Sequence, residues 1–287
     1  MLFGKVESGA REAAIGVKNS RVGLEIHIDG DKVPSAAGLA EVLPLQVVDP
    51  DVHDLVAGGP AGRRRYADWI AFHVEHGYLE HWRRFRRALK QRNAALKANA
   101  GPDALAGWDR ELSETGLEVH EARQRVLEVT RPALEDIGAA LLGCAVNVEY
   151  QQGWSSDKSL AEALADGSDR DRQLASTQAG PHRADLKLQY DARQARRLVS
   201  RGQQKLLACA LILAATEVVQ SQTERPLLLL LDDPAAELDG DSLARLMAGV
   251  VALGCQVIAT ALEPELVLFP ESPRMFHVEQ GRLEKSA

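Results

Sequence analysis

The chain has 287 residues, which is enough for two lobes or for one large α/β domain with a sizeable core. Its formal net charge of −7 excludes a uniformly basic nucleic-acid-binding surface. Cys144, Cys209 and Cys255 are odd in number and far apart, and no apolar run approaches the roughly 18 residues of a membrane span. We therefore expect a cytoplasmic protein without a disulfide framework, a zinc site or a membrane segment.

The N-terminal part of the chain is predicted to be rich in β-strands. Residues 1–17 alternate polar and apolar side chains, which is typical of a strand and not of a signal peptide. Residues 22–33 alternate in the same way around Asp29–Gly30–Asp31, which predicts a hairpin. A short buried strand is expected to end at Pro50, before a loop rich in glycine and proline.

A helical arm is predicted from about residue 67 to residue 142. Leu79, Trp82, Phe85 and Leu89 recur at helical spacing. Gly101–Pro102 interrupts the pattern, and a second helical run covers about 108–142. Two such runs predict an antiparallel pair of helices. The first run also carries many arginines, which could face nucleic-acid phosphates or could form an ordinary solvated helix surface.

The last part of the chain alternates strands and helices. Two strand-like segments come first, and the alternation of helices and strands that follows them predicts a parallel sheet covered by helices. The strands are expected at residues 145–150, 184–190, 226–232 and 255–261, and the helices at residues 203–220 and 240–253.

Two aspartates follow a run of five leucines in "PLLLLLDD", residues 226–233. Continuous aliphatic residues predict a central parallel strand that is buried on both faces. Ligands of such sheets bind beyond the carboxyl ends of the strands, where Asp232 and Asp233 are expected to lie. A hard divalent cation such as Mg²⁺ would relieve the repulsion between the two carboxylates. The alternative is a plain turn at the end of a strand.

The stretch "LVSRGQQKLLACALILA", residues 198–214, begins with a polar turn and continues as an apolar helix. Ser200 can cap that helix, and Gly202 lets a ligand approach the backbone closely. A helix N-terminus with free N–H groups attracts phosphate, and Arg201 adds a cation. The alternative is a capped core helix with a solvated arginine.

The order of these segments carries more information than any one of them. "VSRGQQ" at 199–204, the leucine strand with its aspartates and "AELD" at 236–239 follow the order of signature, Walker B and D-loop in ABC-type ATPases. With these segments, the chain resembles the RecF family of ABC/SMC-like ATPases over essentially its whole length. The resemblance is carried by residues 43–69, 89–97, 170–186, 198–207, 228–239 and 256–261.

The resemblance implies an α/β fold: an ABC/SMC-like ATPase head, with a mixed sheet and flanking helices, that contains an inserted antiparallel helical arm. The head is expected at residues 1–75 and 143–287 and the arm at 76–142. The family's phosphate-binding loop, GxxxxGK[ST], occurs nowhere in the sequence. We therefore expect the N-terminal P-loop strand and helix to be missing, through truncation or degeneration, and ATP binding to be weak or absent.

The resemblance also implies a function in DNA replication and recombinational repair. RecF-like proteins bind ATP and Mg²⁺, form ATP-dependent homodimers, hydrolyse ATP slowly and bind gapped, single-stranded and double-stranded DNA. They act with RecR and RecO in RecA loading, and they are needed for the SOS response. A non-enzymatic DNA- or protein-binding scaffold remains as an alternative. A transporter subunit is a third reading, against which the helical arm argues.

Site roles follow from the resemblance. Asp232 would hold Mg²⁺ through water, and Asp233 would orient the attacking water. Gln46 is a candidate for the Q-loop glutamine, and Thr260 stands where many ABC proteins have a switch histidine. The signature residues that would contact the γ-phosphate of ATP in the opposite subunit are Ser200, Arg201, Gly202 and Gln203. The D-loop residues are Glu237, Leu238 and Asp239, the last at the dimer interface. The candidate DNA contacts are Arg63, Arg64, Arg65, Arg84 and Arg87.

Overall fold

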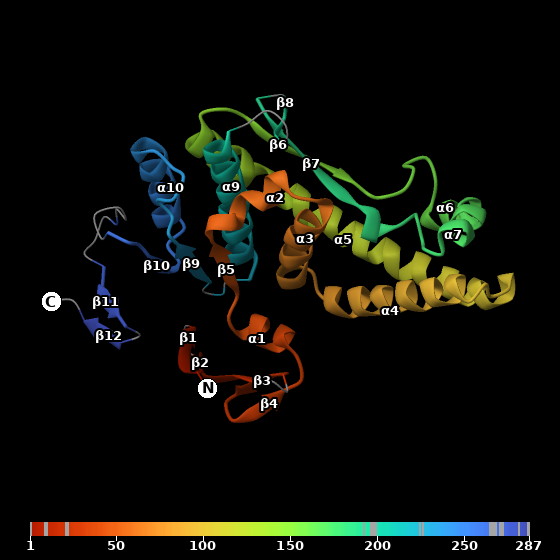
Figure 1. Cartoon of the computed structure of the whole chain (residues 1–287), viewed down its shortest axis with the longest axis horizontal. Coiled ribbons are helices and arrows are strands. Elements are labelled where there is room, and N and C mark those ends of the chain that lie inside the picture. The colour runs from red at the N-terminus through yellow and green to blue at the C-terminus, as the bar shows by residue number, and fades with distance from the viewer. Residues whose placement is uncertain are drawn as a thin grey trace.

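A computed structural model shows how these segments are arranged (Figure 1). The structure describes residues 2–8, 11–20, 23–191, 193–195, 200–223, 225, 227–263, 269, 273–280 and 282–285. Residues 198 and 199, at the start of the predicted signature segment, lie outside the described residues.

An antiparallel sheet forms the N-terminal part of the chain, as its alternating sequence predicts. Its strands pair in the order β1-β2-β3-β4. The predicted hairpin at Asp29–Gly30 is confirmed, because Ile28 pairs with Asp31. The strands are β1 (Leu2–Ser8), β2 (Arg11–Ser20), β3 (Gly23–Ile28) and β4 (Asp31–Val33), and helix α1 (Ala36–Val42) follows them. In Figure 1 this sheet lies at the bottom of the molecule.

The predicted parallel sheet is present, with strand order β10-β9-β5. Its strands are β5 (Leu45–Val48), β9 (Leu228–Asp232) and β10 (Gln256–Thr260). They are joined and covered by the helices α9 (Arg201–Thr223) and α10 (Gly240–Ala252). Because β9 is central and all three strands are parallel, their carboxyl ends meet at one edge.

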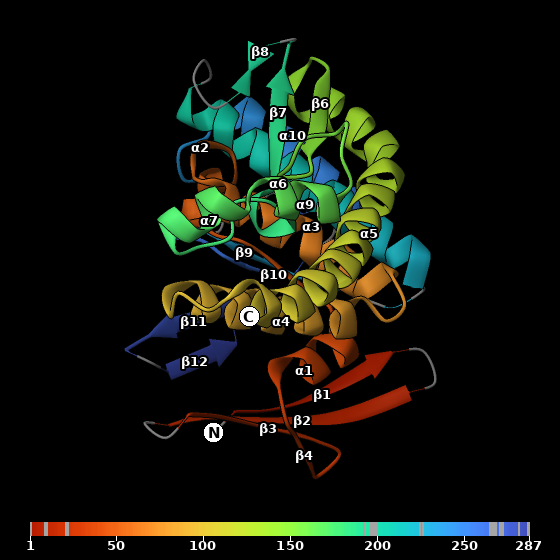
Figure 2. The same cartoon turned by 90° about the vertical axis from the view of Figure 1, so that its right-hand side faces the viewer.

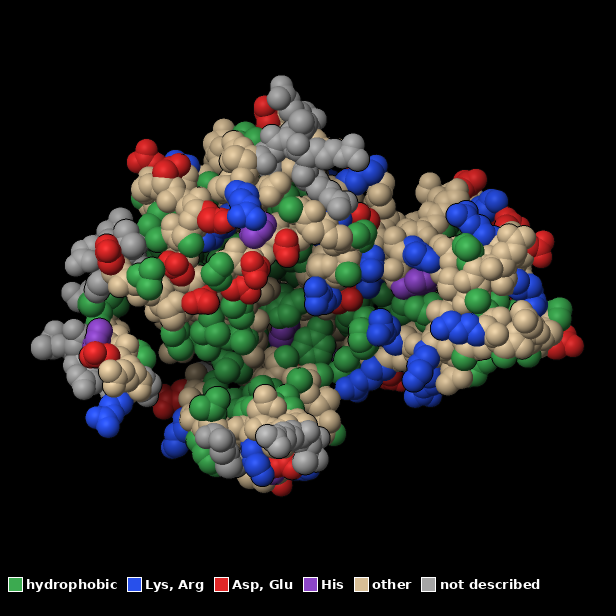
Figure 3. Space-filling model, viewed as in Figure 1, with side chains coloured by type: hydrophobic (Ala, Val, Ile, Leu, Met, Phe, Trp, Pro, Cys, Tyr) green, Lys and Arg blue, Asp and Glu red, His purple; other side chains and the backbone are tan. Residues whose placement is uncertain are grey.

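The two faces of the parallel sheet differ, which corrects the expectation that β9 is buried on both. Leu229 and Leu231 are fully buried on the face that packs against α9. On the other face, Leu45, Val47 and Ile258 are 37%, 41% and 51% exposed. Figure 3 shows hydrophobic side chains open to view in this central region. No described helix covers this face as fully as α9 covers the first. The apolar run in β9 is therefore explained by its place between β5 and β10, and not by helices on both faces.

Helix α9 is the main core helix. It is apolar on all sides, and its residues from Lys205 to Thr216 are buried, which is typical of a helix inside a large core. An 18-residue stretch within its 23 residues has a mean hydropathy of 1.4, so by length and composition alone the helix could span a membrane. However, 72% of that stretch is buried inside the protein, as the core helix of a folded domain requires.

The helical region is longer than its sequence pattern indicates. It comprises η1 (Pro50–His53), α2 (Asp54–Ala57), α3 (Pro60–Val74), α4 (Tyr78–Lys97) and α5 (Pro102–Leu142). The interruption at Gly101–Pro102 is confirmed, with the proline in the first turn of α5. The helices α4 and α5 lie side by side in both views (Figures 1 and 2). The last turns of α5 pack into the head, where Arg245 Nε donates to the Leu141 carbonyl over 2.9 Å.

A second antiparallel sheet, in the order β6-β7-β8, lies beside α5. It confirms the strand-like segments at 145–150 and 184–190. Its strands are β6 (Val146–Gln151), β7 (Asp185–Tyr190) and β8 (Arg193–Gln194). Between β6 and β7 the chain forms α6 (Leu160–Asp166), α7 (Ser168–Leu174) and η2 (Pro181–Arg183). A C-terminal hairpin consists of β11 (Phe276–Glu279) and β12 (Arg282–Lys285).

Three buried arginines tie the segment 171–185 to the helices α3, α4 and α5; we call them the arginine clamp. Arg63 binds both carboxylate oxygens of Asp185, over 2.7 and 3.1 Å. Its Nη1 donates to backbone carbonyls of the 55–58 turn. Arg92 donates to Asp171 over 2.5 Å and to Thr177 Oγ1 over 2.8 Å. The segment is thereby fixed from the α4 side and from the α3 side.

The third member of the clamp is Arg123 of α5. Its Nε donates to Asp68 Oδ1 over 2.6 Å, and its Nη1 donates to the Pro181 carbonyl over 2.7 Å. Burial of a guanidinium requires such pairing, because an unpaired charge in the core costs several kcal/mol. The motif around His182 and Arg183 therefore has a structural explanation that its sequence did not supply: it is the surface that the clamp holds.

Candidate functional site

The carboxyl edge of the parallel sheet brings Asp232, Asp233 and Thr260 together. Thr260 lies opposite Asp232 in the sheet register. Its hydroxyl donates to Asp232 Oδ1 over 2.6 Å and accepts the N–H of Asp233 over 3.2 Å. The predicted switch position is thus in direct contact with the predicted Mg²⁺-binding carboxylate. The threonine hydroxyl does not titrate as a histidine would, and it fixes the rotamer of Asp232.

The start of α9 is built as a reciprocal cap. The Ser200 hydroxyl accepts the N–H of Gln203 over 3.3 Å, and Gln203 Oε1 accepts the N–H of Ser200 over 2.9 Å. This arrangement confirms the capping role predicted for Ser200. Among the described residues, no acceptor lies on the N–H of Arg201 or Gly202. The helix therefore presents free donors and the positive end of its dipole at an exposed position.

The first turn of α9 contacts the turn that follows the two aspartates. Arg201 Nη1 donates to Glu237 Oε1 over 3.1 Å. A Cβ on Gly202 would lie 3.1 Å from the Glu237 carbonyl oxygen, which is tighter than an ordinary contact. Any larger residue than glycine would push the two segments apart. Gly202, which the sequence predicted to let a ligand approach, thus has a packing role against the Glu237 carbonyl within the chain itself.

Lys205 is a site residue that the sequence reasoning missed. Its ammonium is fully buried, and it donates to the carbonyls of Ala236, over 2.6 Å, and Asp233, over 3.5 Å. The two non-glycine residues Asp233 and Glu237 have φ angles of +45° and +65° within the same turn. Such angles are strained for residues with a Cβ and need support from their surroundings. A lysine inside an otherwise apolar helix was the signal that could have identified it.

The D-loop residues continue this turn. Asp239 caps α10, since its Oδ1 accepts the N–H of Ser242 over 2.7 Å. That bond, more than any other contact, holds the pKa of Asp239 below its usual value. Glu237 is exposed and Leu238 is partly buried. The three residues therefore lie on the rim of the edge, beside the start of α9.

Gln46 lies further from this group. It pairs with Leu229, three positions before Asp232 in the central strand. Its side chain is partly buried on the face that carries Val48 and α9. The structure therefore places Gln46 in the body of the sheet and not at the carboxyl edge, with no described contact to either aspartate.

The edge suits an anion and a hard cation held jointly. Asp232 is exposed and has one carboxylate oxygen bonded to Thr260, which leaves the other for a hydrated Mg²⁺. No group of three or more acidic, histidine or cysteine side chains close enough to hold a metal by themselves occurs among the described residues. Mg²⁺ commonly binds through one or two carboxylates together with substrate phosphates, so this arrangement fits a metal that arrives with a nucleotide.

Comparisons with known proteins show the family to which the chain is similar. The family model described as the RecF/RecN/SMC N terminal domain matches residues 4–284. The DNA replication and repair protein RecF of Azotobacter vinelandii is 40% identical over 293 residues, covering 99% of this chain and 80% of its own length. The chain belongs to the RecF family. The RecF of Pseudomonas fluorescens Pf-5 is 38% identical with the same coverage.

A solved structure shows the same fold. The recombination mediator protein RecF in its ATP complex superposes with a TM-score of 0.87 at 23% identity, over 99% of this chain and 79% of that one. The predicted fold, a RecF- and SMC-like ATPase head of mixed α/β architecture, is therefore confirmed. The chain is a homologue of proteins of DNA replication and repair.

The arginines that the RecF resemblance selected for DNA differ in their surroundings. Arg63 is buried in the arginine clamp and each of its guanidinium nitrogens donates inside the protein, so the prediction that it contacts DNA is wrong. Arg64 is half-buried and donates to the Ala184 carbonyl. Arg84 is held by both oxygens of Glu111, over 2.9 and 3.1 Å. Arg65 and Arg87 are exposed and make no ion pair with any described residue.

The same correction applies to Arg92, which the sequence placed among helix arginines that could face phosphates. Its side chain is 1% exposed and belongs to the clamp. Phe85, on the same helix, is buried, as predicted for an aromatic residue of the apolar stripe. A run of basic residues on a helix therefore contained both core and surface side chains, and only burial separates them.

Proposed function

We propose that this chain acts in DNA replication and recombinational repair as the signature- and Walker B-bearing part of an ATP-dependent clamp on gapped DNA. The contact between the start of α9 and the turn after Asp232 and Asp233 carries this proposal. This contact brings the free N–H groups of α9 and Arg201 to the same edge as the exposed Asp232 and the half-buried Asp233. Such a surface fits a nucleotide phosphate with its metal.

In this proposal two copies of the chain face each other across ATP. Arg201 and the free N–H groups of α9 contact the γ-phosphate bound to the opposite copy. Asp232 holds Mg²⁺ through water, Asp233 orients the attacking water, and Asp239 lies at the interface. Gln46 has a smaller part in this proposal, because its position in the sheet is away from the edge. Thr260 adjusts Asp232 through its hydroxyl.

We further propose that ATP binds weakly to this chain by itself. The sequence contains no GxxxxGK[ST] loop, so the backbone cradle and lysine that hold the β- and γ-phosphates in such ATPases have no counterpart in it. A calorimetric titration with MgATP measures this directly. Dissociation constants in the millimolar range are expected, whereas micromolar affinity would contradict the proposal.

The proposed cellular role includes action in the cytoplasm with RecR and RecO, support of RecA loading and participation in the SOS response. It rests on family membership, and the residues proposed to contact DNA are Arg65 and Arg87, with lesser parts for Arg64 and Arg84. Exposed, unpaired guanidinium groups can bind phosphates without first breaking an ion pair.

The test measures binding to a fluorescent gapped duplex at several salt concentrations, with and without MgATP. The double variant R65E/R87E is expected to bind more weakly and to reduce the salt slope by about 2, roughly one for each phosphate contact. Arg282→Glu is the matched control, since Arg282 is exposed on the C-terminal hairpin. Equal losses in both variants would contradict the assignment of these arginines.

The competing function is a non-enzymatic DNA- or protein-binding scaffold. It is favoured by the same absence of a GxxxxGK[ST] loop from the sequence. The two functions separate in the experiment above, because only an ATP-dependent clamp predicts that MgATP changes the affinity for gapped DNA. An affinity that is identical with and without nucleotide would support the scaffold.

A further inference from the structure

A groove of about 720 Å³ runs between strand β6 and helix α5, away from the carboxyl edge of the parallel sheet. Figure 2 shows β6 between β7 and α5. One wall is a single face of α5, with His120, Gln124, Leu127, Glu128 and Arg131 at helical spacing. The other wall consists of consecutive residues 147–152 of β6 and the residues just after it. Side chains of both strand faces line the groove, so the groove follows the edge of β6.

That edge has unused backbone hydrogen-bonding groups. The strand order makes β6 an outer strand of its sheet. Asp191 donates its N–H to the Ala145 carbonyl, and the register continues by pairing Asn147 with Gln189. In an antiparallel pair every second residue bonds to the partner strand, so the N–H and C=O groups of Val148 and Tyr150 point toward the groove. Among the described residues nothing bonds to them.

An aromatic corner closes one end of the groove. The ring of His120 stacks on Tyr150, with ring centroids 5.5 Å apart, and meets the edge of Trp154 at 5.0 Å. His120 Nδ1 is buried and has no hydrogen-bond partner among the described residues, whereas the Tyr150 hydroxyl lies near the Arg123 guanidinium. The partly exposed rings of this corner offer an apolar surface that suits an aromatic or aliphatic side chain of a ligand.

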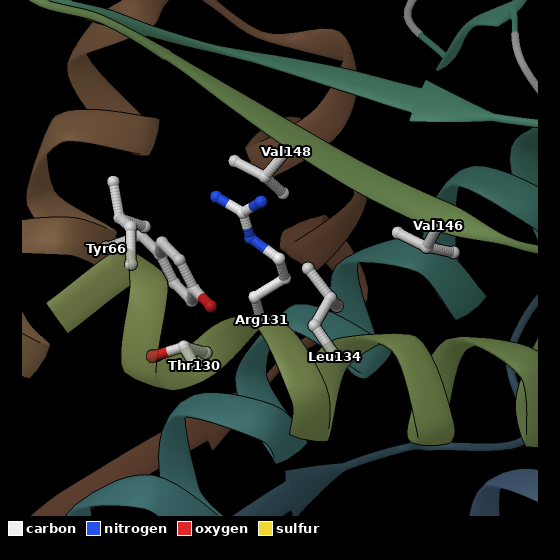
Figure 4. Close-up of a pocket in the computed structure, with 7 residues that line it drawn as sticks. Tyr66, Thr130, Arg131, Leu134, Val146 and Val148 are labelled. Carbon is white, nitrogen blue, oxygen red and sulfur yellow. The ribbon is translucent and has the colours of Figure 1, made fainter. Parts of the chain in front are cut away.

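The charges of the groove are mixed. Arg131 extends from α5 to a position beside Val148 (Figure 4) and makes no ion pair with a described residue. Glu128 lies on the neighbouring turn, and Glu149 is paired with Lys187 over 3.3 Å. A continuous polyanion would meet carboxylates on both walls, which opposes nucleic acid as the occupant. A peptide with an acidic side chain opposite Arg131 complements these charges.

We propose that this groove binds an extended peptide segment of a partner protein, which adds to β6 as a further strand. Its backbone pairs with Val148 and Tyr150, an acidic side chain meets Arg131, and an aromatic or aliphatic side chain enters the His120–Trp154 corner. Strand addition of this kind obtains affinity from main-chain hydrogen bonds and specificity from alternate side chains. The proposal is independent of the ATP site, and it concerns a surface that has no part in the function proposed above.

The test is selection from a displayed library of random nine-residue peptides against the full chain, followed by fluorescence polarisation with the selected peptides in synthetic form. Two substitutions, Arg131→Glu and Trp154→Ala, are each expected to weaken binding about tenfold or more. The control Arg110→Glu, on an exposed position of α5 outside the groove, is expected to leave affinity unchanged. Circular dichroism of each variant confirms that it is folded.

Two measurements on the wild-type chain test the strand pairing itself. In the first, every second backbone nitrogen of the peptide is methylated, in either of the two alternating sets of positions, and only the set whose N–H groups bond to β6 is expected to abolish binding. In the second, the amides of Val148 and Tyr150 should become protected from hydrogen exchange when the peptide binds. The proposal fails if no peptide is selected, if Arg131→Glu binds as tightly as Arg110→Glu, or if methylation of neither set of peptide positions weakens binding. Competition by oligo(dT) at equal concentration would assign the groove to nucleic acid instead.

Discussion

The arginine clamp and the start of α9 use the same kind of side chain in opposite surroundings. In the clamp, Arg63, Arg92 and Arg123 are buried, and their donors bind carboxylates and carbonyls of the protein itself. At the start of α9, Arg201 is 72% exposed at its side chain and has a single partner, Glu237. The guanidinium groups of the first arrangement are buried and bonded within the protein, whereas the second has free donors at a helix N-terminus.

The difference indicates where binding capacity resides in this molecule. A buried charge must be fully paired, so removing its partner is costly and the pair holds the fold together. An exposed charge with unused donors contributes little to stability and remains available to phosphate. The first region should therefore respond to substitution with loss of stability, and the carboxyl edge should respond with local loosening.

The largest effect is expected for Arg92→Met. The substitution leaves Asp171, itself buried, without its cation, and should lower the free energy of unfolding by about 3–5 kcal/mol. Urea denaturation measures it. Arg87→Met is the control on the same helix, and because Arg87 is exposed it should change stability by no more than about 0.5 kcal/mol. Similar small losses in both variants would show that the clamp does not hold the fold.

The next effect is a pH dependence at His182, within the segment that the clamp holds. Burial, followed by the nearby guanidinium groups, lowers the pKa of His182 to about 4. Between the ordinary value near 6.5 and this value, the unfolded chain binds a proton that the folded chain does not. Stability should therefore be complete above about pH 6.5 and fall by about 3 kcal/mol as the pH drops to 4.

The variant His182→Gln isolates that contribution, because glutamine keeps a donor for the Thr177 carbonyl, which His182 Nε2 contacts over 3.0 Å, but does not titrate. Wild type and variant are compared by urea denaturation from pH 7 to pH 4. The difference between their stabilities should change across this range by most of the predicted amount. A constant difference would mean that His182 is protonated equally in the folded and unfolded states.

A smaller and more local effect is expected for Lys205→Met. The methionine fills the buried space but leaves the carbonyls of Asp233 and Ala236 without their donor. The amides of Ala236 and Leu238, bonded within that turn, should exchange about tenfold faster, equivalent to about 1.4 kcal/mol of local stability. Amides in the α4 helix serve as the internal reference. Uniformly faster amide exchange throughout the chain would indicate global destabilisation and would contradict a local effect at the carboxyl edge.

The smallest effect concerns Asp239→Ala at the rim of the edge. Loss of the bond from the Ser242 N–H removes the N-cap of α10 and should cost about 1 kcal/mol in thermal or urea unfolding. The neighbouring Asp241→Ala keeps the cap and should cost only a few tenths of a kcal/mol through the helix dipole. If both substitutions cost the same, Asp239 acts through its charge alone.

Much of the fold could be predicted because its signals are local. The hairpin turn at Asp29–Gly30, the break at Gly101–Pro102 and the alternation of strands and helices after residue 200 each depend on neighbouring residues. The cap at Ser200 is local as well, since serine and glutamine stand three residues apart. The domain division into head and arm stays a prediction, although the end of α5 packs into the head.

The remainder of the site depends on contacts between distant segments. Lys205 reaches a turn about thirty positions further along the chain, and no periodicity in its own helix indicates that partner. The wrong prediction that Arg63 and Arg92 could contact nucleic-acid phosphates has the same origin. Asp185 and Asp171 lie far from them in sequence, with separations of 122 and 79 residues, and their pairing becomes visible only when the helices are packed.

By itself, the sequence determined the order of the elements, the cap of α9, the two aspartates after the leucine strand and membership of the RecF family. The tertiary structure alone decided which arginines are core and which are surface, that one face of the parallel sheet is more open than the other, and that an outer strand runs beside α5. The physical reason is the sequence separation over which each kind of interaction acts. Turn, cap and strand preferences act over a few residues, whereas burial and ion pairing depend on which segments, distant in sequence, share the same space.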